Sequence, residues 1–116
     1  MHPGSVVIDS LTNSLQTYMD LTSMRQKLVS ANIANADTPG YKTQDLDFQS
    51  SFQSMLSGGT PQPATVDGLE TKNDGNNVDL DREGTVLAKT QLQYQLGIQL
   101  VKSNFHQLLS AINGGS

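Results

Sequence analysis

The chain has no cysteine and no tryptophan among its 116 residues. The lack of cysteine excludes disulfide scaffolds, thiolate metal sites and cysteine nucleophiles. Charged residues are also scarce, at 16%, and hydrophobic residues make up only 35%. Both values are low for a compact globule. We therefore expect a small core and apolar faces that are buried against partner chains.

Long hydrophobic runs are missing too, and none approaches the ~20 residues that a membrane-spanning helix needs. The first ten residues contain neither a basic region nor a long apolar region, so we expect no cleaved secretory signal. The formal net charge is −4, from 7 basic and 11 acidic residues. This balance argues against nucleic acid as a partner, because no basic patch is available to neutralise phosphates.

Residues that could support catalysis or metal binding are not grouped along the chain. His2 and His106 lie near opposite ends, and no His, Cys or acidic residue lies three or four positions from His106. The oxygen-rich run 74–81 does not match an EF-hand, because a loop with Gly75 at its sixth position would have a lysine at its third. No phosphate loop or nucleophile elbow is present. We expect no catalytic site, metal, cofactor or small-molecule substrate.

The hydrophobic pattern predicts a single, mostly α-helical domain over residues 1–116. Apolar residues at three- and four-residue spacing predict one long helix over 5–36 and another over 80–112. The two helices are expected to pair as an antiparallel coiled-coil hairpin. Residues 37–79 are expected to form a turn, a short helix and a flexible loop.

Within this central segment, Phe and Met spacing predicts a short helix over 44–57. Glycine, proline and asparagine dominate residues 57–77, which predicts a loop with a short extended piece at 64–69. Asp79 is expected to cap the second long helix, where its side chain can accept hydrogen bonds from free backbone amides.

The expected contact between the long helices is a heptad seam of large apolar residues. On the first helix it comprises Ile8, Leu11, Leu15, Tyr18 and Val29. On the second helix it comprises Leu87, Tyr94, Ile98, Val101, Phe105, Leu108 and Ile112. Gly84 interrupts this seam at a cost of about 1 kcal/mol relative to alanine, and it marks either a kink or a later start of the helix.

Each long helix also carries a second apolar stripe, displaced around the helix from the seam. These stripes comprise Leu21, Met24 and Leu28 on the first helix and Leu92, Leu96 and Leu100 on the second. A helix packed once at a protein surface needs one apolar stripe, so a second stripe calls for another neighbour. Burial within a bundle is one explanation. We favour packing between subunits, because the chain has only two long helices.

The most informative stretch follows the first helix and reads ANIANADTPGYK, residues 31–42. Pro39 suits the second position of a turn, and Gly40 tolerates the positive φ of the third. Residues from Thr38 to Tyr41 are therefore expected to form a type II turn.

Asn32 and Asn35 lie three residues apart and share a helix face, where their amides are expected to bond backbone groups at the corner of the chain. A second block, DGNNVDLDRE, spans residues 74–83. Together the two blocks resemble the terminal motifs of the bacterial flagellar axial proteins, which are rod, hook and hook–filament junction subunits. The resemblance is strongest to the proximal rod subunits.

This resemblance implies a structural subunit of the proximal rod of the flagellar basal body, which polymerises through its terminal helices into a hollow drive shaft. It implies a periplasmic location reached without a cleaved signal peptide. The implied partners are other rod subunits, the adaptor between rod and MS ring, the MS ring, and the flagellar type III export apparatus. The alternatives are another rod subunit of the same family and a cytoplasmic helical export chaperone or adaptor.

Overall fold

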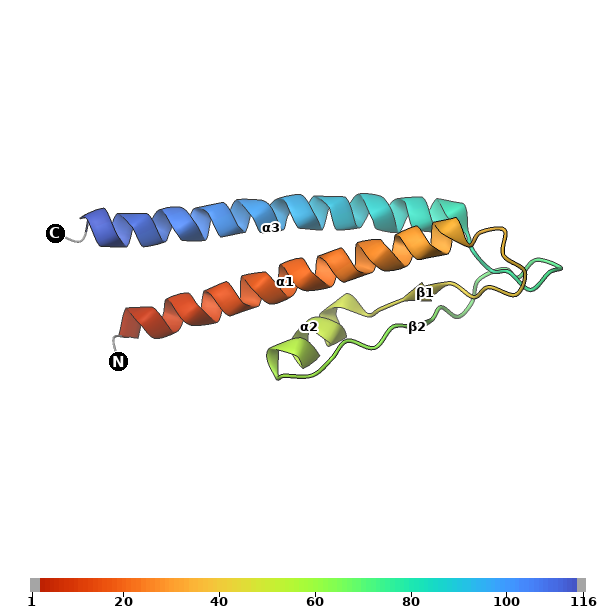
Figure 1. Ribbon diagram of the computed structural model, residues 1–116, viewed down its shortest axis with the longest axis horizontal. Coiled ribbons are helices and arrows are strands. Elements are labelled where there is room, and N and C mark those ends of the chain that lie inside the picture. The colour runs from red at the N-terminus through yellow and green to blue at the C-terminus, as the bar shows by residue number, and fades with distance from the viewer. Residues whose placement is uncertain (1–2, 115–116) are drawn as a thin grey trace.

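Two long helices and one short helix make up most of the computed structural model, which describes residues 3–114 and the side chains of residues 10–113. Helix α1 spans Pro3–Ala34, α2 spans Phe48–Leu56 and α3 spans Leu80–Gly114. Helices α1 and α3 run antiparallel as a hairpin (Figure 1), so the mostly α-helical architecture is confirmed. The radius of gyration is 18.6 Å, against about 13 Å for a compact chain of this length. The molecule is therefore strongly elongated.

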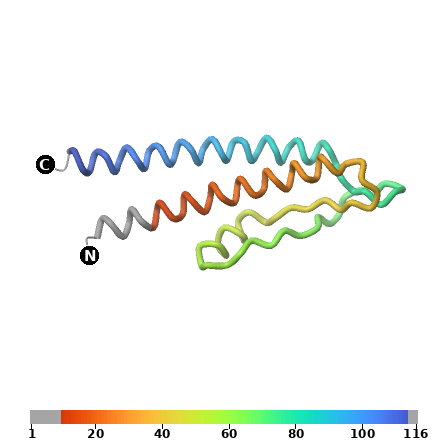
Figure 2. The backbone as a smooth tube through the Cα atoms, viewed as in Figure 1, coloured from red at the N-terminus to blue at the C-terminus, as the bar shows by residue number. Residues whose placement is uncertain are grey.

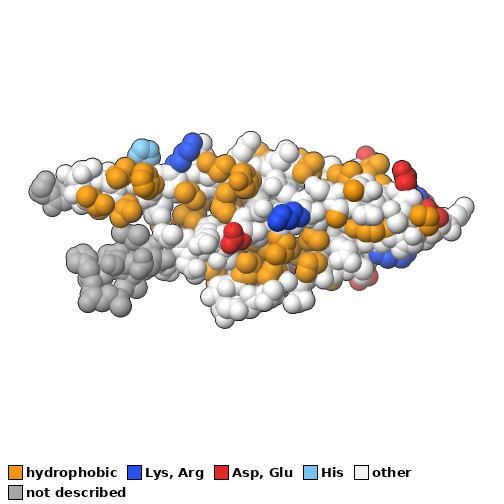
Figure 3. Space-filling view, viewed as in Figure 1, with side chains coloured by type: hydrophobic (Ala, Val, Ile, Leu, Met, Phe, Trp, Pro, Cys, Tyr) orange, Lys and Arg blue, Asp and Glu red, His pale blue; other side chains and the backbone are white. Residues whose placement is uncertain are grey.

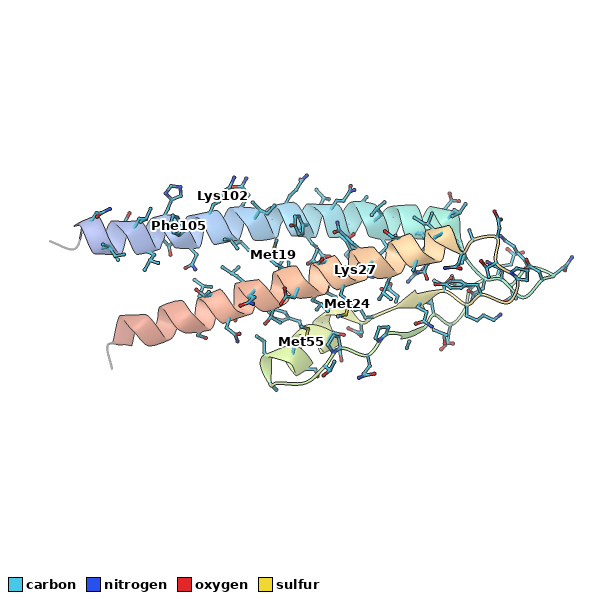
Figure 4. All side chains as sticks on the ribbon, viewed as in Figure 1. Met19, Met24, Lys27, Met55, Lys102 and Phe105 are labelled. Carbon is cyan, nitrogen blue, oxygen red and sulfur yellow. The ribbon has the colours of Figure 1, made fainter. Side chains whose placement is uncertain are left out.

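Helix α1 lies in the middle of the molecule, between α3 on one side and α2 with two short strands on the other (Figure 1). The ring of Tyr18 packs edge-on against Phe48 of α2, with ring centroids 5.5 Å apart. Met24 and Met55 lie on this same side, where α1 and α2 run beside each other (Figure 4). Apart from the salt bridge between Arg82 and Asp45 of the first strand, α3 packs only against α1 among the described elements. One helix thus has neighbours on two sides, whereas the other has a neighbour on one side.

The segment between the long helices departs from the prediction at its start. Gln44–Asp45 forms strand β1 rather than the first turn of a helix, and it pairs antiparallel with strand β2, Ala64–Thr65. Helix α2 begins only at Phe48, because the side chain of Asp47 accepts a hydrogen bond from the amide three residues later and caps the helix. The extended piece expected at 64–69 exists as the two residues of β2.

The interior of the molecule holds few apolar side chains. Among the described residues, the buried hydrophobic side chains are Leu15, Leu21, Val29, Leu46, Val78 and Val86. Polar and charged residues are buried in greater number, including Thr22, Thr90 and Glu83, which have no exposed surface. A core of this kind fits the expectation from composition, and it makes hydrogen bonding a large part of what fixes the fold.

Helix α3 passes Tyr18 and Met19 of α1 at a glycine. A Cβ atom added to Gly97 would overlap the Sδ atom of Met19 and would lie 3.3 Å from the ring of Tyr18. The side chain of Met19 occupies the space between the two long helices (Figure 4). The absence of a side chain at Gly97 therefore leaves room for Met19 and Tyr18 against the backbone of α3.

The same face of α3 continues in both directions at seven-residue intervals from Gly97. Towards the C-terminus, the Nδ2 atom of Asn104 donates a hydrogen bond of 3.3 Å to the Oγ1 atom of Thr12. Towards the N-terminus lie Thr90 and Glu83, both fully buried. Small and polar residues, rather than large apolar ones, thus form the line along which α3 contacts α1.

Five of the expected seam residues are exposed instead of buried between the helices, with exposed fractions of 38–69%: Leu11, Tyr94, Val101, Phe105 and Ile112. Leu15 and Val29 are buried, whereas Tyr18, Leu87, Ile98 and Leu108 are half-buried. The side chain of Ile8 lies outside the described residues. The expected seam followed the largest apolar residues of α3, but the helices approach each other over glycine and threonine. Gly84 is exposed within α3, which starts at Leu80, so a later start is wrong.

The two helical glycines predict opposite results for the same substitution. Gly84→Ala should raise the free energy of unfolding by about 0.5–1 kcal/mol, since the new methyl group meets no other atom and alanine favours the helix. Gly97→Ala should lower it by roughly 1 kcal/mol, because the overlap with Met19 outweighs the same helical gain. Urea denaturation of both variants measures the difference, and equal shifts would contradict the close approach.

Candidate functional site: a polar corner and two open helix flanks

The closed end of the hairpin is organised around Asn32, whose side chain is 1% exposed. Its Nδ2 atom donates hydrogen bonds to the carbonyl oxygen of Gln44, at 2.8 Å, and to the Oε1 atom of Glu83. Its Oδ1 atom accepts hydrogen bonds from the hydroxyl of Tyr41, at 2.9 Å, and from the amide of Gln44, at 3.0 Å. One side-chain amide therefore joins α1, β1, the turn and α3.

An ion-pair network lies beside this amide and links the same elements. Asp45 of β1 accepts two hydrogen bonds of 3.0 Å from the guanidinium of Arg25 on α1. It also accepts one of 2.7 Å from Arg82 on α3, which in turn lies 3.2 Å from the carboxylate of Glu83. All four charged side chains are largely shielded from solvent. We refer to Arg25, Asn32, Asp45, Arg82 and Glu83 as the polar corner.

The two carboxylates of the polar corner experience opposite electrostatic effects. Burial favours the neutral form of Asp45, but hydrogen bonds from Arg25 and Arg82 outweigh it and lower the pKa of Asp45 below its ordinary value. Burial raises the pKa of Glu83 above its ordinary value, and the hydrogen bond from Asn32 and the charge of Arg82 only partly oppose this. The charged form is stabilised at one site and disfavoured at the other.

These opposite shifts predict opposite pH dependences for two amide variants. Asp45 stabilises the fold above its unfolded pKa of ~4, so Asp45→Asn should cost about 2 kcal/mol at pH 7, and the deficit should shrink as the pH falls below 4. Glu83 loses stability as the pH rises through its raised pKa, so Glu83→Gln should gain on the natural chain between pH 4 and pH 7. Urea midpoints at several pH values test both signs, and parallel curves for the two variants would refute the assignment.

The turn after α1 has the backbone geometry of a type II turn. The amide of Tyr41 donates to the carbonyl oxygen of Thr38 at 3.2 Å, and Gly40 has a φ of 76°. The hydroxyl of Thr38 donates to the Oδ1 atom of Asn35, whose Nδ2 atom bonds the carbonyl oxygen of Ala31. Thr38, Pro39 and Gly40 are exposed. Asn35 thus makes local contacts, whereas Asn32 on the same helix face reaches three other elements.

The block at residues 74–83 packs directly on this turn. The side chain of Asn76 is fully buried, and its Nδ2 atom donates to the carbonyl oxygens of Asn35, at 2.9 Å, and Thr38, at 2.8 Å. Its Oδ1 atom accepts a hydrogen bond of 2.8 Å from the amide of Val78. The two sequence blocks, joined here across 41 and 38 positions, are therefore parts of one structure (Figure 2).

Further contacts fasten the end of the expected flexible loop. The amide of Gly40 donates to the carbonyl oxygen of Asp74 at 2.9 Å, and a Cβ atom at Gly75 would lie only 3.3 Å from the Cα atom of Gly40. The Oδ1 atom of Asn77 accepts a hydrogen bond of 2.6 Å from the amide of Thr43. Residues 74–77 of the expected loop are therefore joined to the turn by asparagine side chains.

At the start of α3, Asp79 caps the helix as predicted. Its Oδ1 atom accepts hydrogen bonds from the amides of Asp81, at 3.0 Å, and Arg82, at 3.2 Å. The cap fixes the first turn of α3, and it thereby directs Glu83 towards Asn32.

Beyond this corner, α3 leaves two rows of large apolar side chains uncovered. One row, the leucine flank, comprises Leu92, Leu96 and Leu100, which are 68%, 54% and 43% exposed. The other row, the aromatic flank, comprises Tyr94, Val101, Phe105 and Ile112. Of the twelve large hydrophobic side chains that are exposed in the described part of the chain, nine lie on α3. Apolar surface is visible along this helix in the space-filling view (Figure 3).

The second apolar stripe of α1 is largely buried within the chain, unlike the second stripe of α3. Leu21 is fully buried within the chain, and Met24 and Leu28 are half-buried. The prediction that Leu21 contacts another subunit is wrong, because the chain's own α2 and strands supply the second neighbour of α1 (Figure 1). The stripe of α3 has no such internal neighbour among the described elements.

Comparison with known proteins gives the family. Residues 18–42, which hold the last part of α1 and the turn, match the family model described as Flagella basal body rod protein. The flagellar basal body rod protein FlgB of Salmonella typhimurium is 30% identical over an aligned span that covers 94% of this chain and 97% of that protein. The chain belongs to the FlgB family of flagellar basal body rod proteins.

Other FlgB proteins align over similar spans. FlgB of Yersinia ruckeri is 31% identical, with 94% of this chain and all of that protein covered. FlgB of Bacillus subtilis is 30% identical, with 88% of this chain and 92% of that protein covered. The alignment with the Salmonella protein runs over 134 positions, more than the 116 residues of this chain, so that relative carries residues that this FlgB-family chain lacks.

The polar corner is the part of the FlgB-family chain that sequence reasoning missed. Asp45 was expected in a helix, and Arg25 and Glu83 were given no role across the fold. The sequence gives one indication of the role of Arg25. This residue adjoins the apolar stripe of a helix with few charges, and a charged side chain that is partly buried there needs an oppositely charged or hydrogen-bonding partner.

Two further findings concern the chemistry of the described residues. Among the side chains from residue 10 to 113, no group of three or more His, Cys, Asp or Glu is placed to hold a metal ion. Neither long helix, over residues 3–114, combines the length and apolar character required to cross a bilayer.

Proposed function

We propose that the chain is a structural, non-catalytic subunit of the flagellar basal-body rod, and that it assembles through the leucine and aromatic flanks of α3. The observation that carries this proposal is the exposure of both flanks on a helix that, beyond Arg82, packs only against α1 among the described elements. Soluble monomers rarely leave contiguous apolar surface of this kind open, and such surface marks an interaction site. Membership of the FlgB family supports the rod as the assembly in which these flanks would be covered.

The total accessible surface supports this role. It amounts to 7633 Å², whereas a folded monomer of 12.5 kDa is expected to expose about 6,200 Å². The excess is roughly 1,400 Å², and it accompanies the elongated shape of the hairpin, which leaves much of α3 open to solvent.

We further propose that the subunit belongs to the proximal part of the rod in the periplasm, beside other rod subunits, the rod–MS-ring adaptor and the MS ring. The flagellar type III apparatus would export it unfolded, without a cleaved signal peptide. The small apolar core and the lack of disulfides suit export in this form. A small core limits the packing that is lost on unfolding before export and regained on refolding, and no disulfide has to be broken or re-formed.

Location is the direct test of this proposal. An epitope-tagged copy of the chain, expressed in the source bacterium in place of its own copy, should copurify with isolated basal bodies and restore motility. The tag fits best in the exposed loop around Gln62, far from α3 (Figure 1). Retention of the tagged chain in the cytosol, with basal bodies free of it, would instead indicate an export chaperone and would refute the rod assignment.

A further inference from the structure

We propose that Met19 is a site of reversible oxidation, and that conversion of its sulfur to the sulfoxide loosens α3 from α1. The described side chains include three methionines, Met19, Met24 and Met55, and all three are half-buried. Thioethers that are partly open to solvent are oxidised by peroxides. The three sites therefore differ chiefly in the part of the fold that an added oxygen atom would displace.

The sulfur of Met19 lies directly against the backbone of α3. A Cβ atom added to Gly97 would overlap this Sδ atom, and it would lie 3.3 Å from two carbon atoms of the Tyr18 ring. A glycine has no side chain that could rotate away from a new oxygen atom on the sulfur. A sulfoxide oxygen directed towards α3 therefore requires the helix itself to move.

The ring of Tyr18, which borders the same space, is held from its other side. It packs edge-on against Phe48 of α2, with ring centroids 5.5 Å apart. Phe48 in turn stacks on Phe52, with centroids 6.5 Å apart. Because these contacts join α1 to α2, a shift of the Tyr18 ring that made room for the oxygen would disturb a second interface.

Oxidation also changes the polarity of the contact between the long helices. The sulfoxide oxygen is a hydrogen-bond acceptor, and a buried acceptor without a donor is costly. One turn along α1, the fully buried hydroxyl of Thr22 already donates to the carbonyl oxygen of Tyr18 at 2.8 Å. A sulfoxide at Met19 thus gains a hydrogen bond from Thr22 only if that existing bond is broken.

The other two described methionines lie on the opposite side of α1. Met24 and Met55 are found where α1 and α2 run beside each other, away from α3 (Figure 4). Helix α2 has nine residues and is followed by an exposed loop. Oxidation of Met24 or Met55 should therefore disturb α2 and leave the contact of α3 with α1 in place.

The modification needs a peroxide as its co-reactant. The lone pair of the Met19 sulfur attacks one oxygen of hydrogen peroxide, and the S–O bond forms as the O–O bond breaks. The departing hydroxide takes the proton that is left on the transferred oxygen and becomes water. The sulfur loses two electrons and the peroxide gains them. Methionine sulfoxide reductases reverse the change.

Two full-length variants separate the sites. One carries Met24→Leu and Met55→Leu and retains Met19, and the other carries Met19→Leu and retains Met24 and Met55. Leucine nearly conserves the volume of methionine. Both variants are treated with hydrogen peroxide, and mass spectrometry of their peptides gives the extent of oxidation at each methionine. Amide hydrogen exchange and thermal unfolding are measured before and after the treatment.

Oxidation should have different effects in the two variants. In the chain that retains Met19, exchange at residues 94–101 of α3 should become at least about tenfold faster, and the melting temperature should fall by about 5 °C or more. In the chain that retains Met24 and Met55, faster exchange should be confined to α1 and α2, and residues 94–101 should change less than about twofold. A sulfoxide reductase should restore slow exchange in the first chain.

The natural chain supplies the same comparison if either variant fails to fold. Limited oxidation with peroxide, followed by chromatographic separation of the forms that carry a single sulfoxide, isolates the effect of each methionine without any substitution. The form oxidised at Met19 should show faster exchange at residues 94–101, and the forms oxidised at Met24 or Met55 should not.

Three outcomes would overturn the inference. Full conversion of Met19 with unchanged exchange at residues 94–101 would show that α3 tolerates the oxygen. Resistance of Met19 under conditions that convert Met24 and Met55 would show that peroxide does not reach its sulfur. Equal loosening of α3 by oxidation at all three methionines would show that the contact with Gly97 has no special role. The rod assignment does not depend on any of these outcomes.

Discussion

Asn32→Ala should destabilise the chain by about 4 kcal/mol, the largest effect of any single substitution that we expect. The change removes four hydrogen bonds, two donated and two accepted, from a side chain that is 1% exposed. It also leaves the fully buried carboxylate of Glu83 with only the guanidinium of Arg82 as a partner. A buried group that loses its partner incurs the full desolvation cost, which is greatest for a charge. Urea denaturation at pH 7 measures the loss.

Asn35→Ala provides the matched control for this prediction. Asn35 lies one helical turn from Asn32 on the same face, but its side chain bonds only Ala31 and Thr38 near the surface. We expect a loss below about 1 kcal/mol. Similar losses for the two variants would show that the buried hydrogen bonds of Asn32 do not hold the corner together.

Asn76→Ala should destabilise the chain by about 3 kcal/mol. The side chain is fully buried and bonds two carbonyl oxygens of the first block and one amide of its own block. Without the Nδ2 atom of Asn76, the carbonyl oxygens of Asn35 and Thr38 each lose a hydrogen-bond donor. Alanine has no polar group that could replace this donor. The variant should also speed amide hydrogen exchange at residues 38–43, because the turn is no longer anchored to the segment before α3.

The exposed neighbour Asn73 supplies the comparison for Asn76. It lies three positions earlier in the same stretch, and its side chain is open to solvent. Asn73→Ala should change the free energy of unfolding by less than about 0.5 kcal/mol. If Asn76→Ala is equally mild and leaves exchange at residues 38–43 unchanged, the two blocks are not joined in the way the structure indicates.

Elements governed by local rules could be predicted from the sequence. The long helices follow from apolar spacing, and α3 begins where Asp79 caps it. The turn follows from Pro39 and Gly40, since their backbone preferences act without help from the rest of the chain. The exposure of Leu92, Leu96 and Leu100 could also be predicted, because the chain has only one other long helix and that helix covers a different face of α3.

Contacts between distant residues could not be predicted in the same way. The hydrogen bond from Asn32 to Glu83 joins residues 51 positions apart. The sequence around either residue does not indicate that the other is its partner. The heptad seam is wrong for a related reason: several large apolar residues of α3 are exposed, whereas Gly97 lies against Met19 and Tyr18 of α1. The packing of α2 on α1, which buries Leu21 within the chain, likewise depends on distant contacts that the local pattern does not reveal.

The flanks of α3 should be open in the single chain and covered in the rod. Because the chain has no cysteine, single cysteines can report this directly, one each from Leu96→Cys, Phe105→Cys and, as a buried reference, Thr90→Cys. Maleimide labelling should be fast at positions 96 and 105 in the monomer and at least about tenfold slower in isolated basal bodies, while position 90 should label slowly in both. Equal labelling rates at positions 96 and 105 in monomer and rod would contradict the account.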